Sequence, residues 1–298
     1  MKQILILSGK GGTGKTTVAG AFIELSKSRS FADCDVDAPN LHLVFKHLPE
    51  PSKTDFYGFK KALIKNLKCI SCGLCEKICK FNAIKNKFIN IHKCEGCGLC
   101  VEICPVKAIV MSDYSSGSLI LYKDNDRVFS TAKLKMGSGA SGKLVSAVKK
   151  QLSDNFINSE ISIIDGSPGI GCPVIASVSG ADIVIVVTEP TVSGIHDMKR
   201  IIDTARHFNI NPVVCINKFD INTENTREIE KYCGSTNIDV IGKIPFDQTV
   251  VKAVNSCKNI SDYPESPAGK AVKEIWDFVD KKLIKTKKEN YYENCGSM

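Results

Sequence analysis

The chain has 298 residues, 43% of them hydrophobic and 24% charged, and its mean hydropathy of -0.04 is typical of a globular protein with a substantial core. It contains no apolar run of about 18 residues, and the short apolar start at residues 3–7 lacks a signal-peptide cleavage site, so we expect neither a membrane span nor export. In a cytoplasmic protein disulfides are rare, and the fourteen cysteines therefore indicate metal or redox chemistry.

The formal net charge of +8 is concentrated in one segment. Residues 57–112 contain ten lysines, no arginine and three acidic residues, together with eight of the cysteines. An oxidised iron–sulfur cubane held by four thiolates carries a charge of about −2. The lysines are therefore expected either to solvate an anionic cluster domain or to form a docking surface for an acidic partner. Nucleic-acid binding is the less favoured third explanation.

Outside this segment, strand-like apolar runs alternate with helical patterns, which predicts a doubly wound, mainly parallel α/β sheet. The expected strands are residues 3–8, 30–34, 161–164, 183–187 and 213–216, with a hairpin over 118–130. The expected helices are residues 15–28, 143–152, 194–208 and 267–285, and the polar tail beyond residue 285 is expected to be frayed. We predict a discontinuous domain of residues 1–56 and 113–298, interrupted by a small inserted domain of residues 57–112.

The inserted segment contains an internal repeat in which Cys69–Ile84 matches Cys94–Ile109 at an offset of 25 residues. Each copy has the Cys-x2-Cys-x2-Cys-x3-Cys spacing of bacterial ferredoxins, in which the first three cysteines ligate one cluster and the fourth ligates the other. The spacing predicts two [4Fe–4S] clusters. The ligands of the first would be Cys69, Cys72, Cys75 and Cys104, and those of the second Cys94, Cys97, Cys100 and Cys79.

Zinc is the alternative for these cysteines. Zinc sites usually pair two Cys-x-x-Cys units a dozen or more residues apart, whereas here four cysteines lie within eleven residues, twice. This crowding favours iron–sulfur clusters. Pro105 follows the second motif but Lys80 follows the first, a difference expected to alter hydrogen bonding without removing a ligand.

Residues 9–16 match the phosphate-binding pattern G-x4-G-K-[ST] between an expected strand and an expected helix. The backbone of such a loop surrounds the phosphates of a nucleotide, its lysine reaches the β- and γ-phosphates, and its hydroxyl residue reaches Mg²⁺. The lysine and hydroxyl residue are Lys15 and Thr16. The other nucleotide-binding residues expected here are Gly11, Gly12, Thr13, Gly14 and Thr17.

Residues 10–17, with a second lysine at Lys10, resemble the signature-lysine loop of the superfamily of MinD, ParA and Mrp ATPases and the nitrogenase iron protein. The resemblance implies that ATP lies between two subunits and that Lys10 reaches the nucleotide of the partner. It therefore implies an ATP-dependent homodimer that hydrolyses ATP to ADP and phosphate, with Lys10 and Lys15 as catalytic residues. The inserted segment resembles the ferredoxin domain of a MinD-like subfamily.

Two further segments extend the resemblance. Residues 33–40 are similar to switch I, which implies that Asp35 orients the attacking water and that Asp33 lies near Mg²⁺. Residues 165–169 are similar to switch II, which implies a magnesium role for Asp165 and switch roles for Pro168 and Gly169.

The base-binding residues are expected from the same resemblance. Asn217, Lys218 and Pro245 lie in segments similar to those that contact adenine. With Asp220, the first of these segments also resembles the guanine-reading N-K-x-D pattern of GTPases, so GTP is the alternative nucleotide.

Cys172 lies seven residues after Asp165, where the nitrogenase iron protein has a cluster-ligating cysteine. One interpretation is a structural or weakly reactive cysteine. The other is an extra ligand of a dimer-bridging or transferred cluster. The remaining cysteines, Cys34, Cys215, Cys233, Cys257 and Cys295, have no partner spacing and are expected to be structural.

Three functions are compatible with these motifs. The first is ATP-gated electron transfer through two clusters to a partner protein, which the complete set of eight ligands favours. The second is iron–sulfur or metallocofactor assembly in the manner of Mrp. Mrp-like carriers use a Cys-x-x-Cys pair near the C-terminus, and the absence of such a pair before residue 298 counts against this function. The third is a partitioning or positioning ATPase, although the last expected helix is not of the basic amphipathic kind that binds membranes.

Overall fold

The computed structural model describes residues 2–45, 47–157 and 159–285. The tail that was expected to be frayed and Cys295, which was expected to be structural, lie outside these ranges. No helix within them is both long enough and apolar enough to cross a membrane.

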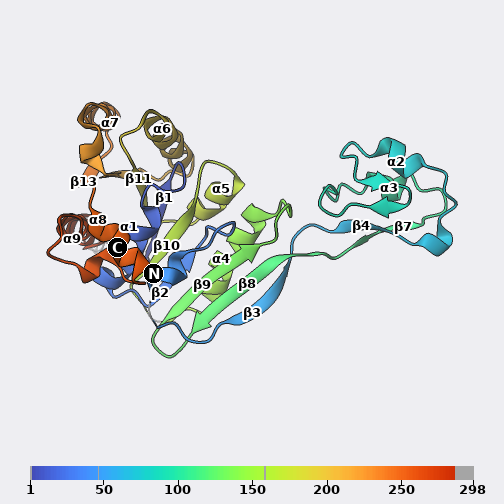
Figure 1. Ribbon diagram of the computed structural model, residues 1–298, viewed down its shortest axis with the longest axis horizontal. Coiled ribbons are helices and arrows are strands. Elements are labelled where there is room, and N and C mark those ends of the chain that lie inside the picture. Colours follow the sequence, from blue (N-terminus) through green and yellow to red (C-terminus); the bar gives the residue numbers. More distant parts are fainter. Residues whose placement is uncertain (1, 46, 158, 286–298) are drawn as a thin grey trace, which may run out of the picture.

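A nine-stranded sheet forms the centre of the larger part of the described chain (Figure 1). Its strands, in spatial order, are β13 (Val240–Ile244), β12 (Val213–Asn217), β11 (Ile183–Thr188), β1 (Lys2–Ser8), β10 (Ile161–Pro168), β2 (Ser30–Asp33), β9 (Val128–Leu134), β8 (Ser115–Lys123) and β3 (Ser52–Tyr57). Neighbours from β13 to β9 are parallel, whereas β8 and β3 are added antiparallel. The prediction of a mainly parallel, doubly wound sheet is confirmed.

Helices cover both faces of this sheet, and the alternation of side chains along β1 shows why. Ile4 and Ile6 point into one apolar core with α1 (Lys15–Ser26) and α9 (Pro267–Phe278). Leu5 and Leu7 point into the other, covered by α4 (Ser141–Asp154), α5 (Cys172–Val178), α6 (Val192–His207) and α7 (Thr223–Ser235). A strand buried on both faces is apolar throughout, as residues 4–7 are.

The remaining elements of the sheet-bearing part are short. They are α8 (Gln248–Asn255) and the 3-10 turns η1 (Leu41–Val44), η3 (Phe219–Ile221) and η4 (Ile260–Asp262). The predicted closing helix is α-helical only as far as Phe278 and continues as a π-helical segment, Val279–Lys285.

Residues 58–114, here called the arm, project from the edge of the sheet between β3 and β8 (Figure 1). The arm contains two small antiparallel sheets, β4–β7 and β5–β6, and two short helices. The bounds are β4 (Lys61–Ile64), η2 (Asn66–Lys68), α2 (Leu74–Ile78), β5 (Ile84–Lys85), β6 (Phe88–Ile89), α3 (Leu99–Glu102) and β7 (Ile109–Ser112). The division of the chain into domains at residues 57 and 112 stays a prediction. Tyr57 itself pairs with Ser115 in the large sheet.

Candidate nucleotide site and cysteine-lined cavities

The phosphate loop connects β1 to α1 and is held by close neighbours. Gly12 and Gly14 have φ angles of 81° and 90°, which L side chains rarely adopt. A β-carbon on Gly14 would also lie 2.2 Å from Nδ2 of Asn217. Because Asn217 Nδ2 donates a hydrogen bond to the Thr13 carbonyl at 2.8 Å, the loop is anchored from the end of β12, two strands away from β1 in the sheet.

A cavity of about 240 Å³ opens over this loop. Its lining residues are Ser8, Lys10, Gly11, Gly12, Thr13, Gly14, Lys15, Thr16, Thr17, Asp35, Asn40 and Pro168. The structure therefore brings the loop, Asp35 and Pro168 together around one space. Ser8 and Asn40 were not singled out from the sequence, although Ser8 ends β1, and ligands of such sheets bind beyond the carboxyl ends of the strands.

Lys15, Thr16 and Asp165 form a buried polar group at the base of this cavity. Lys15 Nζ lies 2.5 Å from Asp165 Oδ1, and the Thr16 hydroxyl donates to Asp165 Oδ2 at 2.7 Å. Burial lowers the pKa of Lys15, but the carboxylates of Asp165 and Asp33 outweigh it and leave that pKa raised. The Lys15 ammonium is thus stabilised beside Asp165, and its contact with phosphate oxygens stays a prediction.

Asp33, at the end of β2, is fully buried and does not line the cavity. Its Oδ1 accepts the backbone N–H of Asp35, and its Oδ2 accepts those of Asn40 and Leu41, each at 2.9 Å. Burial, reinforced by Asp165, raises its pKa to about 7. Its carboxylate therefore fixes the turn that carries Asp35, and its expected proximity to Mg²⁺ stays a prediction.

Lys10 extends from the loop to Glu189, which directly follows β11. The Lys10 ammonium lies 2.7 Å from Glu189 Oε1 and also donates to the hydroxyls of Thr191 and Ser193, both at 3.2 Å. Lys218 Nζ lies 3.3 Å from Glu189 Oε2 and donates to the Gly12 carbonyl at 3.3 Å. Glu189 was missed from the sequence. The sequence feature that could have identified it is its position directly after an apolar strand, because ligands bind beyond the carboxyl ends of parallel strands.

The residues that were predicted to contact the base are not among those that line the cavity. Asn217 and Lys218 are engaged with the phosphate loop, as described above, and Pro245 follows β13. Asp220 Oδ1 accepts the backbone N–H of Phe246 at 2.7 Å, so it connects the two segments that were expected to contact the base. The choice between adenine and guanine stays a prediction.

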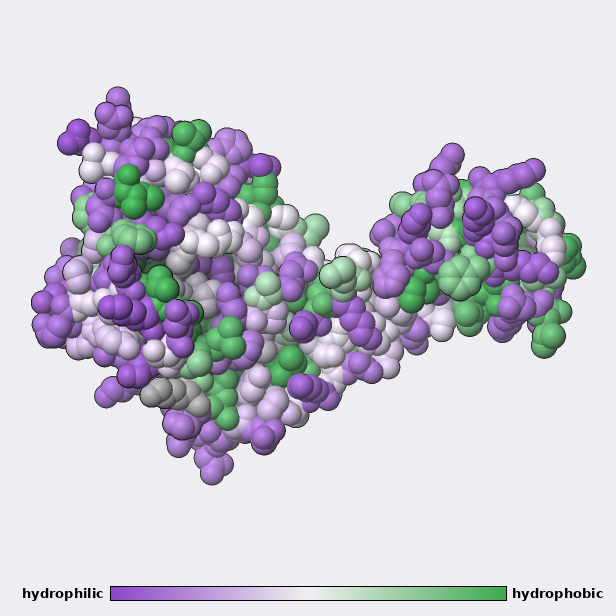
Figure 2. Space-filling model, viewed as in Figure 1, coloured by the Kyte–Doolittle hydropathy of each residue, from purple (hydrophilic) through white to green (hydrophobic). Residues whose placement is uncertain are grey.

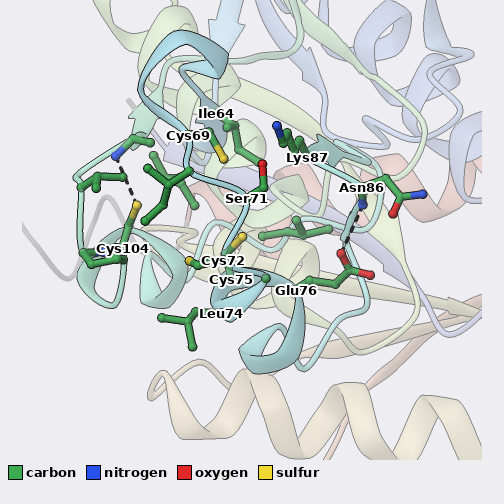
Figure 3. Close-up of a pocket in the computed structure, with 17 residues that line it drawn as sticks. Ile64, Cys69, Ser71, Cys72, Leu74, Cys75, Glu76, Asn86, Lys87 and Cys104 are labelled. Carbon is green, nitrogen blue, oxygen red and sulfur yellow. Dashed lines mark hydrogen bonds between the residues drawn. The ribbon is translucent and has the colours of Figure 1, made fainter.

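The arm contains two cavities, each lined by one of the two predicted sets of four cysteines. The first, here called site I, has a volume of about 330 Å³ and is lined by Cys69, Cys72, Cys75 and Cys104. Figure 3 shows the sulfur atoms of these four residues placed around one space. The second, site II, has a volume of about 50 Å³ and is lined by Cys79, Cys94, Cys97 and Cys100. The crossover of the fourth cysteine between the motifs, expected from the ferredoxin spacing, is thus present in the cavity linings.

The donor set of these cavities fits an iron–sulfur cluster. Backbone N–H groups of Ala83 and Ala108 donate to the sulfurs of Cys79 and Cys104 at 3.4 and 3.2 Å, the same position in each repeat. Hydrogen bonds to the sulfurs of a cluster's ligands tune its reduction potential. In the described residues no three His, Cys, Asp or Glu side chains are grouped as a site for a metal ion. Each cavity is lined by four cysteines, the number of ligands that a cubane takes.

A family model described as "CobQ/CobB/MinD/ParA nucleotide binding domain" matches residues 4–260. The chain belongs to this family. The matched range includes the phosphate loop, residues 33–40 and 165–169, and the arm.

Relatives of this MinD/ParA-family chain span almost its whole length. The uncharacterized protein MJ0578 of Methanocaldococcus jannaschii is 33% identical over 92% of this chain and 95% of its own length. The septum site-determining protein MinD of Bacillus subtilis is 26% identical over 92% of this chain and 87% of its own. Among solved structures, MinD of Pyrococcus horikoshii in complex with Mg-ADP covers 95% of this chain and 97% of its own, with a TM-score of 0.57 and 18% identity. At that identity the last comparison supports the fold alone.

In this MinD/ParA-family chain, Cys172 begins α5, directly after the switch II segment. It is exposed, and a β-carbon on Gly142 would lie 3.2 Å from its Cβ. Gly169, in the same segment, donates its backbone N–H to the Ser8 carbonyl at 2.9 Å. The segment 169–172 therefore contacts β1 at one end and the start of α4 at the other. A cluster-ligating role for Cys172 stays a hypothesis.

Proposed function

We propose that the chain is an ATPase that couples its nucleotide state to electron transfer through two [4Fe–4S] clusters held in the arm. The observation that supports this most strongly is that each cavity of the arm is lined by one complete ferredoxin ligand set. When bound, each cluster would store and release one electron. Cys69, Cys72, Cys75 and Cys104 would hold one at site I, and Cys79, Cys94, Cys97 and Cys100 the other at site II.

The nucleotide cavity supplies residues for ATP hydrolysis. Attack of water on the γ-phosphate requires neutralisation of developing negative charge and a correctly placed nucleophile. Lys15 would meet the phosphates, Asp35 would orient the water, and Lys10 of a second subunit would reach across a homodimer. Lys15 and Thr16 are bonded to Asp165 in this structure, so binding of ATP with Mg²⁺ must replace those contacts.

The arm contacts the loop before α4 and the first turn of that helix. A β-carbon on Gly139 would lie 3.8 Å from Oε2 of Glu95, next to the site II ligand Cys94. Lys143 lies over the ring of Phe59 with its ammonium 4.1 Å from the ring centroid. Because Gly142, in the first turn of α4, lies beside Cys172, movement of the segment after Asp165 on hydrolysis would have a contact route to site II.

A partner protein is part of the proposal. The arm exposes several large hydrophobic side chains among its lysines, and Figure 2 shows green patches on its surface. Examples are Leu63, Leu67, Ile70 and Phe88, which are between 54% and 104% exposed. An apolar surface rimmed by lysines fits an acidic electron-transfer partner.

The test is an anaerobic redox titration of the two sites with no nucleotide, with MgADP and with MgATP, followed by electron transfer to a low-potential one-electron acceptor protein. We expect MgATP to shift at least one midpoint potential in the parent protein. The matched control is Lys15→Gln, in which MgATP should leave both potentials unchanged. Identical potentials in all three states of the parent would contradict the coupling.

Cluster assembly is a second candidate, because Cys72 and Cys97, one ligand of each predicted cluster, are exposed. An exposed ligand is accessible to an incoming acceptor thiolate. Transfer of intact clusters from the iron-loaded protein to an apo-acceptor, faster with ATP than without, would favour this function over electron transfer.

A positioning or partitioning role is a third candidate, favoured by the similarity to the septum site-determining protein MinD of Bacillus subtilis. In that case the arm would be dispensable for the ATPase cycle. Stimulation of ATP hydrolysis by DNA or by lipid vesicles, but not by redox partners, would support it.

A further inference from the structure

Lys61, the first residue of β4, is a buried lysine in the arm. It is 5% exposed, and its ammonium donates a hydrogen bond to the carbonyl oxygen of Cys94, the first cysteine of the second motif. The other buried lysine in the described ranges, Lys15, is paired with Asp165. No ion pair between described residues includes Lys61.

A buried ammonium without a carboxylate partner is unfavourable, because the protein interior does not replace its hydration. One backbone carbonyl accepts a hydrogen bond from one of the three N–H donors of the ammonium, but it does not neutralise the positive charge. Lys61 does not itself line site II, but two of its close neighbours do: Ala62, the next residue along β4, and Cys94, whose carbonyl accepts its hydrogen bond. An anionic group in site II would supply the missing counter-charge.

Site I has no equivalent buried cation. The 25-residue offset of the repeat places Asn86 at the position that corresponds to Lys61. Asn86 is neutral and exposed, and its backbone N–H donates to Glu76 Oε2 at 3.2 Å beside site I (Figure 3). Lys87 also lines site I, but it is exposed, so solvent screens its charge. The two cavities therefore differ in their electrostatic surroundings although their cysteine spacing is the same.

We propose that Lys61 is the counter-cation of site II: it stabilises an anionic cluster there and raises the reduction potential of that site above the value it would have without the lysine. This inference rests on the proposed function, because it needs a cluster in site II. Reduction adds one electron from a low-potential one-electron donor, such as dithionite, and takes the cluster with its four thiolates from about −2 to about −3. A nearby buried cation stabilises the more negative state more strongly.

The experiment is an anaerobic redox titration of the iron-loaded protein with dithionite, followed by the EPR signals of the reduced sites. The variant is Lys61→Met, which keeps the length of the side chain and removes its charge. We expect one of the two midpoint potentials to fall and the other to stay unchanged. A tenfold loss in the equilibrium constant for reduction at that site would correspond to about 59 mV.

Two matched variants make the result specific. Lys60→Met removes the neighbouring lysine, which is 62% exposed and lies 3.6 Å from Asp113, and should leave both potentials unchanged. Lys61→Arg keeps the charge and should keep both potentials close to those of the parent. If Lys61→Met instead loses half of the bound iron while Lys61→Arg retains it, the charge is needed to hold the cluster, which also supports the proposal.

Other outcomes overturn it. Full iron content with unchanged potentials in Lys61→Met would show that Lys61 does not act on site II. Loss of half of the iron in both Lys61→Met and Lys61→Arg would assign Lys61 a packing role in place of an electrostatic one. A parent protein that binds no iron would instead refute the proposed function itself, so the two failures are distinguishable.

Discussion

Glu189 lies between two lysines, Lys10 and Lys218, that the resemblance assigned to the nucleotide. Burial raises the pKa of Glu189, but hydrogen bonds from Lys10 and Lys218 outweigh it and leave that pKa lowered, so the carboxylate is ionised near neutral pH. In the proposed dimer Lys10 must reach the partner's nucleotide. Its contact with Glu189 therefore stabilises a conformation in which Lys10 is not available to the partner subunit, and this disfavours dimerisation.

The first prediction concerns this contact. Glu189→Gln keeps the shape of the side chain and removes its charge. We expect dimerisation with a non-hydrolysable ATP analogue at about fivefold lower protein concentration, the equivalent of about 1 kcal/mol per dimer or about 0.5 kcal/mol for the partly exposed ion pair in each subunit. Sedimentation velocity measures the dimer fraction. Glu230→Gln, which removes a 2.9 Å pair with Lys243 on the surface, is the control and should have no effect. A weaker dimer in Glu189→Gln would show that Glu189 supports the interface.

The second prediction concerns the buried Asp33, whose pKa burial raises from 3.8 to about 7. Because the Asp33 carboxyl group binds its proton more tightly in the folded state, its protonation stabilises the fold. This stabilisation is complete at a pH below the pKa of the unfolded state, and it is lost as the pH rises through about 7. Between pH 5.5 and 8 the parent should therefore lose more unfolding free energy than Asp33→Asn. Urea denaturation at several pH values measures this slope. Asp113→Asn, at an exposed position, should follow the parent, and equal slopes for Asp33→Asn and the parent would refute the prediction.

Single-residue roles were predictable from the sequence where a backbone motif defines them. The phosphate loop, Asp35 and Pro168 do line one cavity, because a glycine loop after a buried strand has few possible shapes. Glu189 and Lys61 were not predicted, because no motif contains them. Their importance follows from which strand ends and which cavity lie beside them, and only the fold determines that.

At the scale of elements, strands buried on both faces were the easiest to predict, since residues 4–7 of β1 and 183–187 of β11 are apolar without interruption. The edge strand β3 was not predicted as a strand. Its residues are mostly exposed, so the hydrophobic pattern that identifies a strand is missing. Its pairing with β8 is nevertheless what places the two ends of the arm side by side.

The third prediction follows from this pairing. Because Tyr57 and Ser115 are partners on adjacent antiparallel strands, a two-residue Asn-Gly turn in place of residues 58–114 should close a hairpin. We expect the shortened protein to be folded, to bind ATP and to contain no iron, as measured by circular dichroism, nucleotide titration and iron analysis. The matched control carries the same turn and Lys15→Gln, and it should fold without binding ATP. An insoluble or unfolded shortened protein would show that the arm is part of the ATPase core.

For the whole molecule, the difference in core size between its two parts matters most. The buried cluster of the arm consists of Ala62, Ala83, Ile84, Cys94, Cys100 and Ile109, whereas the sheet is packed on both faces. Small units with so little buried apolar surface usually need a metal or disulfides to fold. The sequence predicted both ligand sets of the arm from their spacing, but the unequal surroundings of the two sites needed the structure.

The fourth prediction is that cluster removal unfolds the arm and leaves the sheet intact. After treatment with ferricyanide and EDTA, backbone amides of residues 61–112 should exchange with deuterium much faster, while those of β1 and β10 should exchange as before. Hydrogen-exchange mass spectrometry measures both regions in one experiment. The untreated protein in ferricyanide-free buffer with EDTA is the control. Unchanged protection in the arm after complete iron loss would show that its fold is independent of the clusters.

The attachment of the arm through two neighbouring strands has a consequence for the history of the protein. A segment that leaves and re-enters a sheet at paired positions can be gained or lost in one genetic event, because the order and hydrogen bonding of all other strands stay the same. An ancestral nucleotide-dependent protein could therefore have acquired a redox module without any change in its existing catalytic residues. Natural chimaeras that carry different modules at this position would be the expected outcome of such an origin.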